Sequence, residues 1–584
     1  MASAVESSNA LARLFERAHR TGEAMGLTVP GGAALFQAGE ASETLYLLRY
    51  GRLGASATDP DGKTRLLGIV HPGETVGEFS LLTGETHQAT VTALRDSELW
   101  AMERHTFLAA AGRDAAAMGE LARLIAERAR HIAPGAPVSP PRVFGLVALS
   151  QGLAVHDLAE ELCRAMAEGG WKALSAGPEA AAEGLEWFSR FEASGDFVIY
   201  AAEAGDDDWI DRLSRQIDHM MLVADGERHP PAITDTLGRA AARFGPLADL
   251  VLSHPARKRT PSGGAAFERA LSPNRVLHLR RGHRQDLGRL ARRITSQGVG
   301  LVLSGGAARA YAHVGALKAL SAAKVPVDFV AGVSMGAIIG AGEAMEWDPA
   351  ELDRRIRKAF VESSPVDDIA FPIVSMTHGR KVRRRLAEHF GDRDIEDLWR
   401  PFFCLSTNLT TGAYQLHRRG KVREALTASV ALPGLLPPVV KNRQVLVDGA
   451  VIKNFPVDVM RGYHSGPIIG IDVTRAQSIT AKELTGEFSL WRWIVSGAWR
   501  DGPPIVSILM RAGTVGAERD IAAARAAADV LVLPPIEDIE IRDWKAYAPA
   551  VEAGELAMRQ ALDALDRPVT ELRLSPRSKP WSTA

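Results

Sequence analysis

The chain has 584 residues, 46% of them apolar and 24% charged, which is the composition of an ordinary globular protein long enough for several domains. Its formal net charge of -1 excludes a global attraction to nucleic acid or anionic lipid, so any membrane contact must come from a local patch. Cys163 and Cys404 match no metal-binding spacing, and we expect both to be reduced thiols in a cytosolic protein.

Neither a secretion signal nor a membrane-spanning segment is predicted. The first residues lack a basic start followed by an apolar core, and no apolar run approaches the roughly 18 residues that a membrane helix needs. We therefore expect a cytoplasmic protein, with peripheral contact at the inner face of the membrane as an open alternative.

The pattern of predicted elements changes along the chain. Residues 10–132 contain short, turn-punctuated strands typical of a small β-barrel or jelly roll, and end in a helix rich in alanine and arginine. A Pro-rich linker, 133–141, leads to 142–280, where buried-type strands alternate with helical stretches as in a parallel α/β sheet. A helical connector at 281–297 precedes a second α/β unit at 298–570. We therefore predict a multidomain protein with a barrel, a middle α/β segment and a C-terminal α/β domain.

A loop of small residues follows the strand that opens this last domain. In "GLVLSGGAARAYAHVGAL" the strand runs into Gly305 and Gly306, and a helix follows; minimal side chains at a helix N-terminus expose N–H groups to an anion. The Lys-Ser/Thr ending of a P-loop and the Gly-x-Gly-x-x-Gly spacing are both absent. The sequence therefore favours an oxyanion over a phosphate cofactor, and we predict no cofactor and no metal site.

One βα unit later, "GVSMG" places Ser334 between a predicted strand and a predicted helix. A nucleophile elbow needs small residues two positions before and after its serine because the turn is cramped, and Gly332 and Gly336 supply them. A glycine-bearing turn without chemistry is the alternative. The oxyanion-type loop one crossover earlier favours the nucleophile.

The candidate acid is Asp448, at the end of the apolar strand in "QVLVDGA". A Ser-Asp-His triad would need a histidine beyond it, and only His464, in a polar turn, is available. A Ser-Asp dyad, with Asp448 as general base, fits the sequence better. Taken alone, the Asp-Gly pair is better interpreted as a turn that ends a strand.

The segments "SGGAAR", "GVSMG" and "VDGA", in this order, resemble the patatin-like phospholipases, and "LTASVALPGLLPPV" and "NFPVDV" extend the resemblance. It implies hydrolysis of acyl esters of lipids, with Ser334 as nucleophile and Asp448 as base. The oxyanion hole that it implies is formed by loop amides, and an arginine fixes the loop: Gly305, Gly306, Ala307 and Arg309.

The loop departs from the family pattern at two positions. Ala307 and Ala310 stand where the family usually has glycine. Because alanine does not easily take a positive φ, we expect ordinary backbone angles at both, with Ala310 as the more serious departure. His313, one helical turn after Arg309, is interpreted as a structural histidine.

The N-terminal barrel resembles a cyclic-nucleotide-binding domain. In "GETVGEFSLLTGETHQATV", Gly77 and Glu78 match the pair that engages the ribose in that family. His87 stands where the family has an arginine that clamps the cyclic phosphate. This argues against a cyclic nucleotide and favours a degenerate regulatory or assembly module; a weak sensor for another anion is the alternative.

Together, the barrel, the middle segment and the C-terminal domain resemble the neuropathy-target-esterase branch of the patatin-like proteins. The middle segment has no P-loop, so we expect a scaffold. The resemblance implies a lysophospholipid or phospholipid substrate; nucleic acid is not predicted as a partner, and the oligomeric state is left open. The alternative function is a ligand-sensing regulatory protein whose patatin-like domain is weak or inactive.

Two segments are candidates for contact with a membrane. Residues 487–504 carry tryptophans and arginines near helical spacing, which suits a lipid interface, but a core helix capping the catalytic sheet is the favoured interpretation. The basic run at 378–390 could meet lipid head groups, although a solvated helix face is the commoner explanation.

Overall fold

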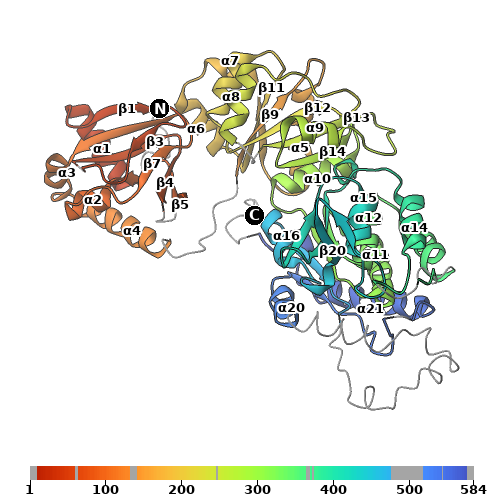
Figure 1. The fold of residues 1–584 in the computed structure, drawn as a ribbon. Helices are drawn as coiled ribbons and strands as arrows, with labels where there is room; N and C mark the ends of the chain where they lie inside the picture. Colours follow the sequence, from red (N-terminus) through yellow and green to blue (C-terminus); the bar gives the residue numbers. More distant parts are fainter. Residues whose placement is uncertain are drawn as a thin grey trace. The chain divides into compact units, whose positions relative to one another are not determined.

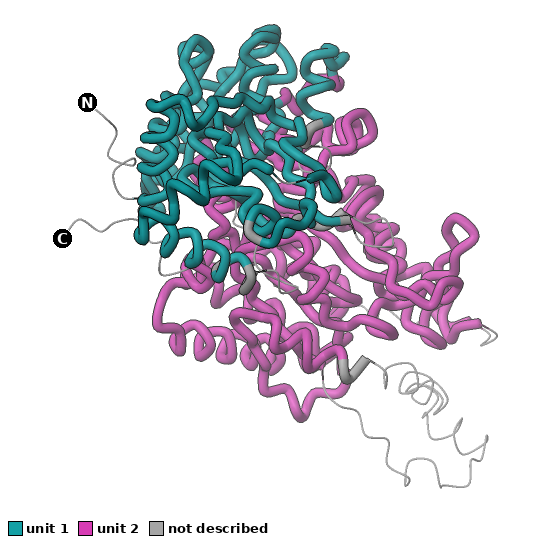
Figure 2. Tube along the Cα trace, turned by 90° about the vertical axis from the view of Figure 1, so that its left-hand side faces the viewer, with its two compact units in different colours: residues 1–223, 231–249 teal, residues 224–230, 250–584 magenta. Residues whose placement is uncertain are grey.

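The computed structural model describes nine stretches of the chain: residues 9–41, 43–58, 64–131, 141–244, 248–362, 368–370, 374–474, 517–541 and 543–574. The chain forms two compact units, which Figure 2 distinguishes by colour: residues 1–223 with 231–249, and residues 224–230 with 250–584. Among the helices in the described stretches, none is both long and apolar enough to cross a membrane.

The N-terminal part of the first unit is the predicted jelly roll, which the structure confirms. Its described strands form two antiparallel sheets, in the orders β1-β8-β3-β6 and β2-β7-β4-β5 (Figure 1). Apolar side chains such as Leu48, Leu53 and Leu99 fill the space between the sheets. The strands are β1 Met25–Val29, β2 Ala34–Phe36, β3 Thr44–Tyr50, β4 Leu53–Thr58, β5 Thr64–Val70, β6 Thr75–Val76, β7 Thr90–Ala93 and β8 Ser97–Glu103; the helices are α1 Ala10–Thr21, α2 Glu78–Thr83, α3 Arg104–Ala111 and α4 Ala115–His131.

The middle segment has the predicted alternation of strands and helices. In the first unit, parallel strands lie in the order β10-β11-β9-β12. All residues of β9 and β11 are buried, as expected for strands covered on both faces. The elements are β9 Val143–Ala148, α5 Val155–Glu168, β10 Ala173–Ala176, α6 Leu185–Ala193, β11 Phe197–Ala202, α7 Asp207–Ser214, β12 His219–Asp225 and α8 Asp235–Phe244, followed by β13 Asp249–His254, α9 Gly264–Leu271, β14 Arg275–Arg280 and α10 Arg284–Ile294.

The C-terminal part of the second unit is built on a mostly parallel sheet with the core order β17-β16-β15-β21-β22. Its strands are β15 Gly300–Leu303, β16 Phe329–Val333, β17 Phe402–Asn408, β18 Ala413–His417, β19 Val439–Lys441, β20 Gln444–Asp448, β21 Ile468–Ile471 and β22 Val530–Val532. Its α-helices are α11 Ala312–Ala322, α12 Met335–Ala344, α13 Pro349–Ile356, α14 Arg380–Phe390, α15 Val422–Ser429, α16 Val457–Tyr463, α20 Ala517–Ala526 and α21 Tyr547–Asp563.

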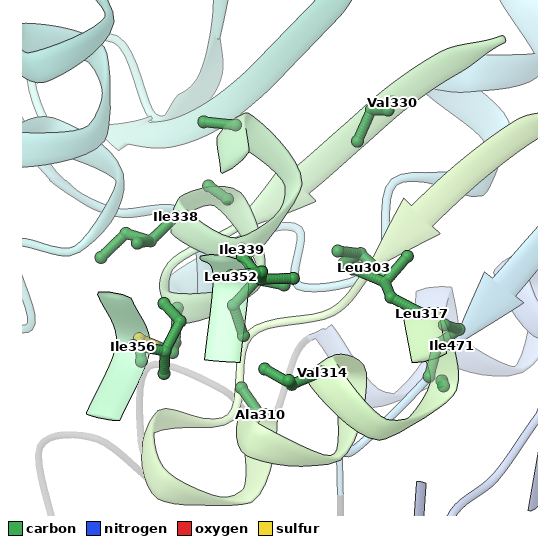
Figure 3. Packing of buried hydrophobic residues seen from close by; sticks show 14 of the residues in the cluster. Leu303, Ala310, Val314, Leu317, Val330, Ile338, Ile339, Leu352, Ile356 and Ile471 are labelled. Carbon is green, nitrogen blue, oxygen red and sulfur yellow. The ribbon is translucent and has the colours of Figure 1, made fainter. Parts of the chain in front are cut away.

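Two apolar clusters cover the two faces of this sheet. Leu301 and Leu303 belong to the larger cluster, which includes residues of α11, α12 and α21, whereas Val302 belongs to the smaller one with residues of α16. This alternation follows from the period of two in a strand. Figure 3 shows the larger cluster from close by, with Ala310 and Val314 both projecting into it. The result is a three-layer α/β/α domain.

Helices α11 and α21 cross with their backbones in close contact. A Cβ atom added at Gly315 would overlap the carbonyl oxygen of Val551, and one added at Gly554 would overlap that of Ala312. Only glycine permits this approach. The close crossing holds α21 against the helix that follows the loop of small residues.

Candidate active site

Ser334 lies at a sharp turn between β16 and α12. Its φ of 53° and ψ of -127° are strained for a residue with a side chain. A Cβ on Gly332 would lie 2.6 Å from the carbonyl carbon of Gly336, and a Cβ on Gly336 would overlap the carbonyl oxygen of Ser304. Both glycines are thus required by close contacts, and this is the geometry predicted for a nucleophile elbow.

The strand register places Asp448 next to this turn. Strand β17 pairs through residues 402–405 with the parallel strand β16, and through 406–408 with the antiparallel strand β20. Strand β18 pairs with residues 404–408 and overlaps both, so it occupies the opposite edge of β17. Strands β16 and β20 therefore follow one another along a single edge. Asp448 pairs with the first β17 residue beyond β16, which brings it beside Ser334.

The two side chains are hydrogen-bonded. The hydroxyl of Ser334 donates to Oδ2 of Asp448 at 2.6 Å, and the N–H of Ala450 donates to Oδ1 at 2.9 Å. Asp448 is fully buried, whereas Ser334 is partly exposed. Burial raises the pKa of Asp448 to about 6, although both hydrogen bonds oppose the rise. The carboxylate is therefore ionised at neutral pH and can accept a proton from the serine.

The two candidate histidines lie elsewhere. The ring of His464 is 2.7 Å from the carbonyl oxygen of Gly298, which precedes β15, whereas Ser334 follows the neighbouring parallel strand β16, so the two residues lie at opposite ends of these strands. Nε2 of His313 donates to the carbonyl of Ser304 at 2.8 Å. Burial lowers the pKa of each ring to about 4, so both are neutral at pH 7. Within the described residues, the histidine expected for a triad is not next to Asp448.

The N–H of Gly305 is occupied by another side chain. It donates to Oδ1 of Asn454 at 3.0 Å, so this amide is not available to an oxyanion, in contrast to the expectation from the sequence. The next two amides, at Gly306 and Ala307, have no hydrogen-bond acceptor in the part of the chain that the structure describes. The candidate oxyanion hole is thereby reduced to these two N–H groups.

The remainder of the loop is anchored by the segment that precedes α21. Nε of Arg309 donates to the carbonyl of Ile539 at 2.7 Å, and the N–H of Ala308 donates to that of Ile541 at 3.1 Å. The N–H of Arg309 also donates to the carbonyl of Gly306 at 3.1 Å. The side chain of Arg309 thus joins the loop to the segment that precedes α21.

The expectation of ordinary backbone angles at both alanines is wrong for Ala307. Its φ is 47°, in the left-handed region that alanine disfavours by about 1 kcal/mol or more. The anchors on both sides of it impose this conformation. Ala310 keeps a negative φ in the short 3₁₀ helix 307–311, where its methyl group is buried in the core. The more demanding alanine is therefore Ala307.

Two further residues hold the dyad, and neither was assigned a role from the sequence. Oγ of Ser429 accepts from the N–H of Ser334 at 3.0 Å and donates to the carbonyl of Leu405 at 2.7 Å. The N–H of Asp448 donates to the carbonyl of Ala431 at 2.9 Å. The segment "LTASVALPG" is part of the resemblance to the patatin-like family, but the sequence contains no signal for these particular contacts.

In the barrel, the residues that match the nucleotide-binding pattern form the candidate nucleotide cassette. Two of them, Glu78 and His87, contact other protein groups. Gly77 precedes α2 with a φ of 94°, and Glu78 is 2% exposed. Arg128 of α4 donates to Oε1 of Glu78 at 2.6 Å and to the carbonyl of Thr75 at 2.7 Å. The carboxylate of Glu78 is thus paired with a guanidinium of the same domain.

His87 is also enclosed. Its ring stacks on Phe36 with centroids 3.7 Å apart, and its Nδ1 lies 3.2 Å from Oγ of Ser80. Burial lowers its pKa, so the ring is neutral at pH 7. A neutral, stacked ring offers little attraction to a cyclic phosphate.

Of the two segments considered for membrane contact, the structure describes one, the basic run at 378–390. Helix α14 buries Val382, Leu386 and Phe390 and exposes Arg380, Arg383 and Arg384. The segment 487–504 lies outside the described residues.

Comparison with known proteins gives two family matches. Residues 301–461 match the patatin-like phospholipase family, and residues 27–114 match the cyclic nucleotide-binding domain. A protein of Mycobacterium tuberculosis (strain CDC 1551), described as an uncharacterized NTE family protein, is 30% identical over 577 residues, which cover 96% of this chain and 94% of that protein.

Two named relatives are longer. A neuropathy target esterase of Drosophila melanogaster is 28% identical over 80% of this chain and 37% of its own length. A lysophospholipase of Neosartorya fischeri is 27% identical over 92% of this chain and 42% of its own length. The chain thus spans about two fifths of these two proteins.

The strain at Ala307 gives a test of the loop geometry. Ala307→Gly should stabilise the protein by about 1 kcal/mol, because glycine takes a positive φ without a steric penalty. Ala310→Gly should destabilise it by about 1 kcal/mol or more, since a buried methyl group is lost at an ordinary φ. Urea unfolding followed by near-UV circular dichroism ranks the midpoints; equal losses in both variants would contradict the assigned backbone.

Proposed function

Because the chain belongs to the NTE family, we propose that it is a serine esterase that hydrolyses acyl esters of lysophospholipids or phospholipids through a Ser334–Asp448 dyad. The observation that carries the proposal is the 2.6 Å hydrogen bond between the hydroxyl of Ser334, at a strained elbow, and a buried carboxylate that is ionised at neutral pH. The names of the longer relatives, an esterase and a lysophospholipase, support the choice of substrate.

The chemistry follows from this geometry in two steps. Asp448 takes the proton of Ser334 as Oγ attacks the ester carbonyl, and the N–H groups of Gly306 and Ala307 bind the oxyanion, each contributing about 3 kcal/mol to the transition state. Asp448 then gives the proton to the leaving alcohol. Water attacks the acyl-serine with Asp448 again as base, and the fatty acid is released with Ser334 restored.

The alternative of a ligand-sensing protein with an inactive domain rested on the two alanines of the loop. In the conformations that both take, the amides of Gly306 and Ala307 have no acceptor among the described residues, which supports the esterase over this alternative. In the barrel, Oε1 of Glu78 accepts from Arg128, and the ring of His87 stacks on Phe36. We therefore propose that the barrel is a regulatory or assembly module that acts without a cyclic nucleotide.

The first experiment measures fatty acid release from lysophosphatidylcholine. Ser334→Ala and Asp448→Asn should each lower kcat/KM by roughly 10³-fold or more, because the nucleophile or its base is lost. Ser465→Ala, an exposed serine next to His464, is the matched control and should retain full activity. A fluorophosphonate probe should label the wild type and not Ser334→Ala; full activity in Ser334→Ala would refute the assignment.

The pH dependence follows from the raised pKa of Asp448. Activity requires the ionised carboxylate, so kcat/KM should fall about tenfold per pH unit below the pKa of about 6. Because the pKa is raised in the folded state, the protonated carboxyl favours folding. This contribution to stability is present at low pH and is lost as pH rises through about 6. Asp448→Asn should therefore gain thermal stability over the wild type at pH 8 more than at pH 5. An acid limb near pH 4 in the activity profile would contradict the raised pKa of Asp448.

Cyclic nucleotides should leave the barrel unchanged. A ligand that binds the folded state raises the melting temperature. Glu78 and His87 already contact Arg128 and Phe36, so we expect neither residue to bind a cyclic nucleotide. We expect no shift in the thermal unfolding of the full chain with millimolar cyclic AMP or cyclic GMP. A dose-dependent rise of several degrees would show that the cassette is functional.

We propose that the exposed face of α14 contacts anionic lipid. Ile369 and Val374, just before it, are 59% and 65% exposed, so apolar and basic side chains occur together. Backbone hydrogen bonds join residues 376–377 to 434–435, close in sequence to Ser429, which holds the elbow. This pairing links the segment that precedes α14 to the stretch of chain that follows α15.

Charge reversal tests this patch. Replacement of Arg380, Arg383 and Arg384 by Glu should reduce cosedimentation with vesicles of phosphatidylserine and phosphatidylcholine at least tenfold, at about 1 kcal/mol per basic residue. Arg354→Glu with Arg559→Glu, two exposed arginines on α13 and α21, is the control for charge reversal elsewhere on the surface. Equal binding of both variants would assign lipid contact to another surface.

A further inference from the structure

We infer that Asn454 is a positioning residue for the candidate oxyanion hole: its side-chain amide holds the peptide between Gly305 and Gly306 in the orientation that turns the N–H of Gly306 toward the nucleophile. The inference rests on the proposed esterase function. It assigns a role to a residue outside the dyad and outside the loop itself.

The hydrogen bonds of Asn454 determine the orientation of its side-chain amide, that is, the positions of Oδ1 and Nδ2. Oδ1 accepts from the N–H of Gly305 at 3.0 Å, and Nδ2 donates to the carbonyl of Gly305 at 3.1 Å and to Oγ1 of Thr474 at 3.0 Å. A backbone N–H can only donate and a carbonyl can only accept, so the opposite orientation of the amide is excluded. Asn454 is 8% exposed, and water therefore competes little for these bonds.

Planarity carries this constraint to the next amide. In a trans peptide the carbonyl and the N–H point in opposite directions. The carbonyl of Gly305 faces Asn454, so the N–H of Gly306, in the same peptide plane, faces away from it. The loop passes directly against the nucleophile here, since a Cβ on Gly305 would lie 3.0 Å from the Cβ of Ser334. The N–H of Gly306 has no acceptor in the described part of the chain.

The preceding peptide, between Ser304 and Gly305, is also held by hydrogen bonds. The carbonyl of Ser304 accepts from His313, and the N–H of Gly305 donates to Asn454. The peptide at 305–306 differs, because Asn454 is the one donor to its carbonyl among the described residues, and two glycines flank it. Glycine gives little resistance to rotation, so loss of the Nδ2 donor would free this peptide to turn. Asn454 is therefore the contact on which the direction of the Gly306 N–H depends.

The chemistry of the contact requires an asparagine. A planar group must present one acceptor and one donor, and aspartate would keep the acceptor while repelling the carbonyl of Gly305. Glutamine would add a methylene to a side chain that already reaches both backbone groups of Gly305, at 3.0 and 3.1 Å. The same segment carries Asp448 six residues earlier, so the base and the positioning residue belong to one stretch of chain.

The test compares Asn454→Asp and Asn454→Ser with Thr474→Val, which removes only the third partner of the side chain. In both Asn454 variants kcat should fall about 10²- to 10³-fold, the cost of an oxyanion donor, with KM within about threefold of wild type. Thr474→Val should stay within about tenfold of wild type. If the aspartate variant does not fold, the serine variant, whose space a water can fill, carries the same comparison.

A long-chain alkyl trifluoromethyl ketone separates positioning from a structural role. It forms a hemiketal oxyanion with the active serine, so its Ki should rise in parallel with the loss of kcat/KM, while the Kd of the product fatty acid stays constant. An unchanged Ki, or an equal rise in Ki and fatty acid Kd, would overturn the inference. A wild type that neither hydrolyses lysophosphatidylcholine nor reacts with a fluorophosphonate would instead overturn the proposed function, and the inference with it.

Discussion

One edge of strand β17 carries both halves of the candidate dyad, and the other features of the site depend on this register. Strand β16 occupies the first part of the edge and ends in the serine turn; strand β20 occupies the second part in the opposite direction and ends in Asp448. A shift of one residue in the pairing of β20 would turn the carboxylate to the other face of the sheet. The hydrogen bond between the two side chains is thus a consequence of strand pairing rather than of a flexible loop.

The buried position of Asp448 sets a balance between stability and chemistry. The carboxylate is fully buried, and the only hydrogen bonds found for it among the described residues come from a hydroxyl and a backbone N–H. Removal from water raises its pKa toward neutrality, which makes it a stronger base than an exposed aspartate while it stays ionised at pH 7. Ser429 and Ala431 hold the two ends of this arrangement through backbone contacts.

Local patterns predicted much of the fold and the centre of the site. Strand spacing, the glycines around Ser334 and the Asp-Gly turn each depend on a few consecutive residues, and the structure places these elements as expected. The contact of Asn454 with Gly305 joins residues 149 positions apart, and no local pattern contains it. The positive φ of Ala307 is likewise imposed by carbonyls more than 200 residues away, against the preference of alanine itself. His87 could be identified as a departure, but its stacking on Phe36 depends on the backbone pairing of His87 with residues 39–40, which follow β2.

The anchoring of the loop by Ile539 and Ile541 bears on how this domain can be divided. The match to the patatin-like family ends at residue 461, and that stretch includes the serine, the aspartate and Asn454. It does not include Thr474, the two isoleucine carbonyls, or helix α21, which packs against α11. An expression fragment cut to the boundaries of the family match would keep both side chains of the candidate dyad and lose the contacts that shape the candidate oxyanion loop. A minimal catalytic fragment must therefore extend through α21.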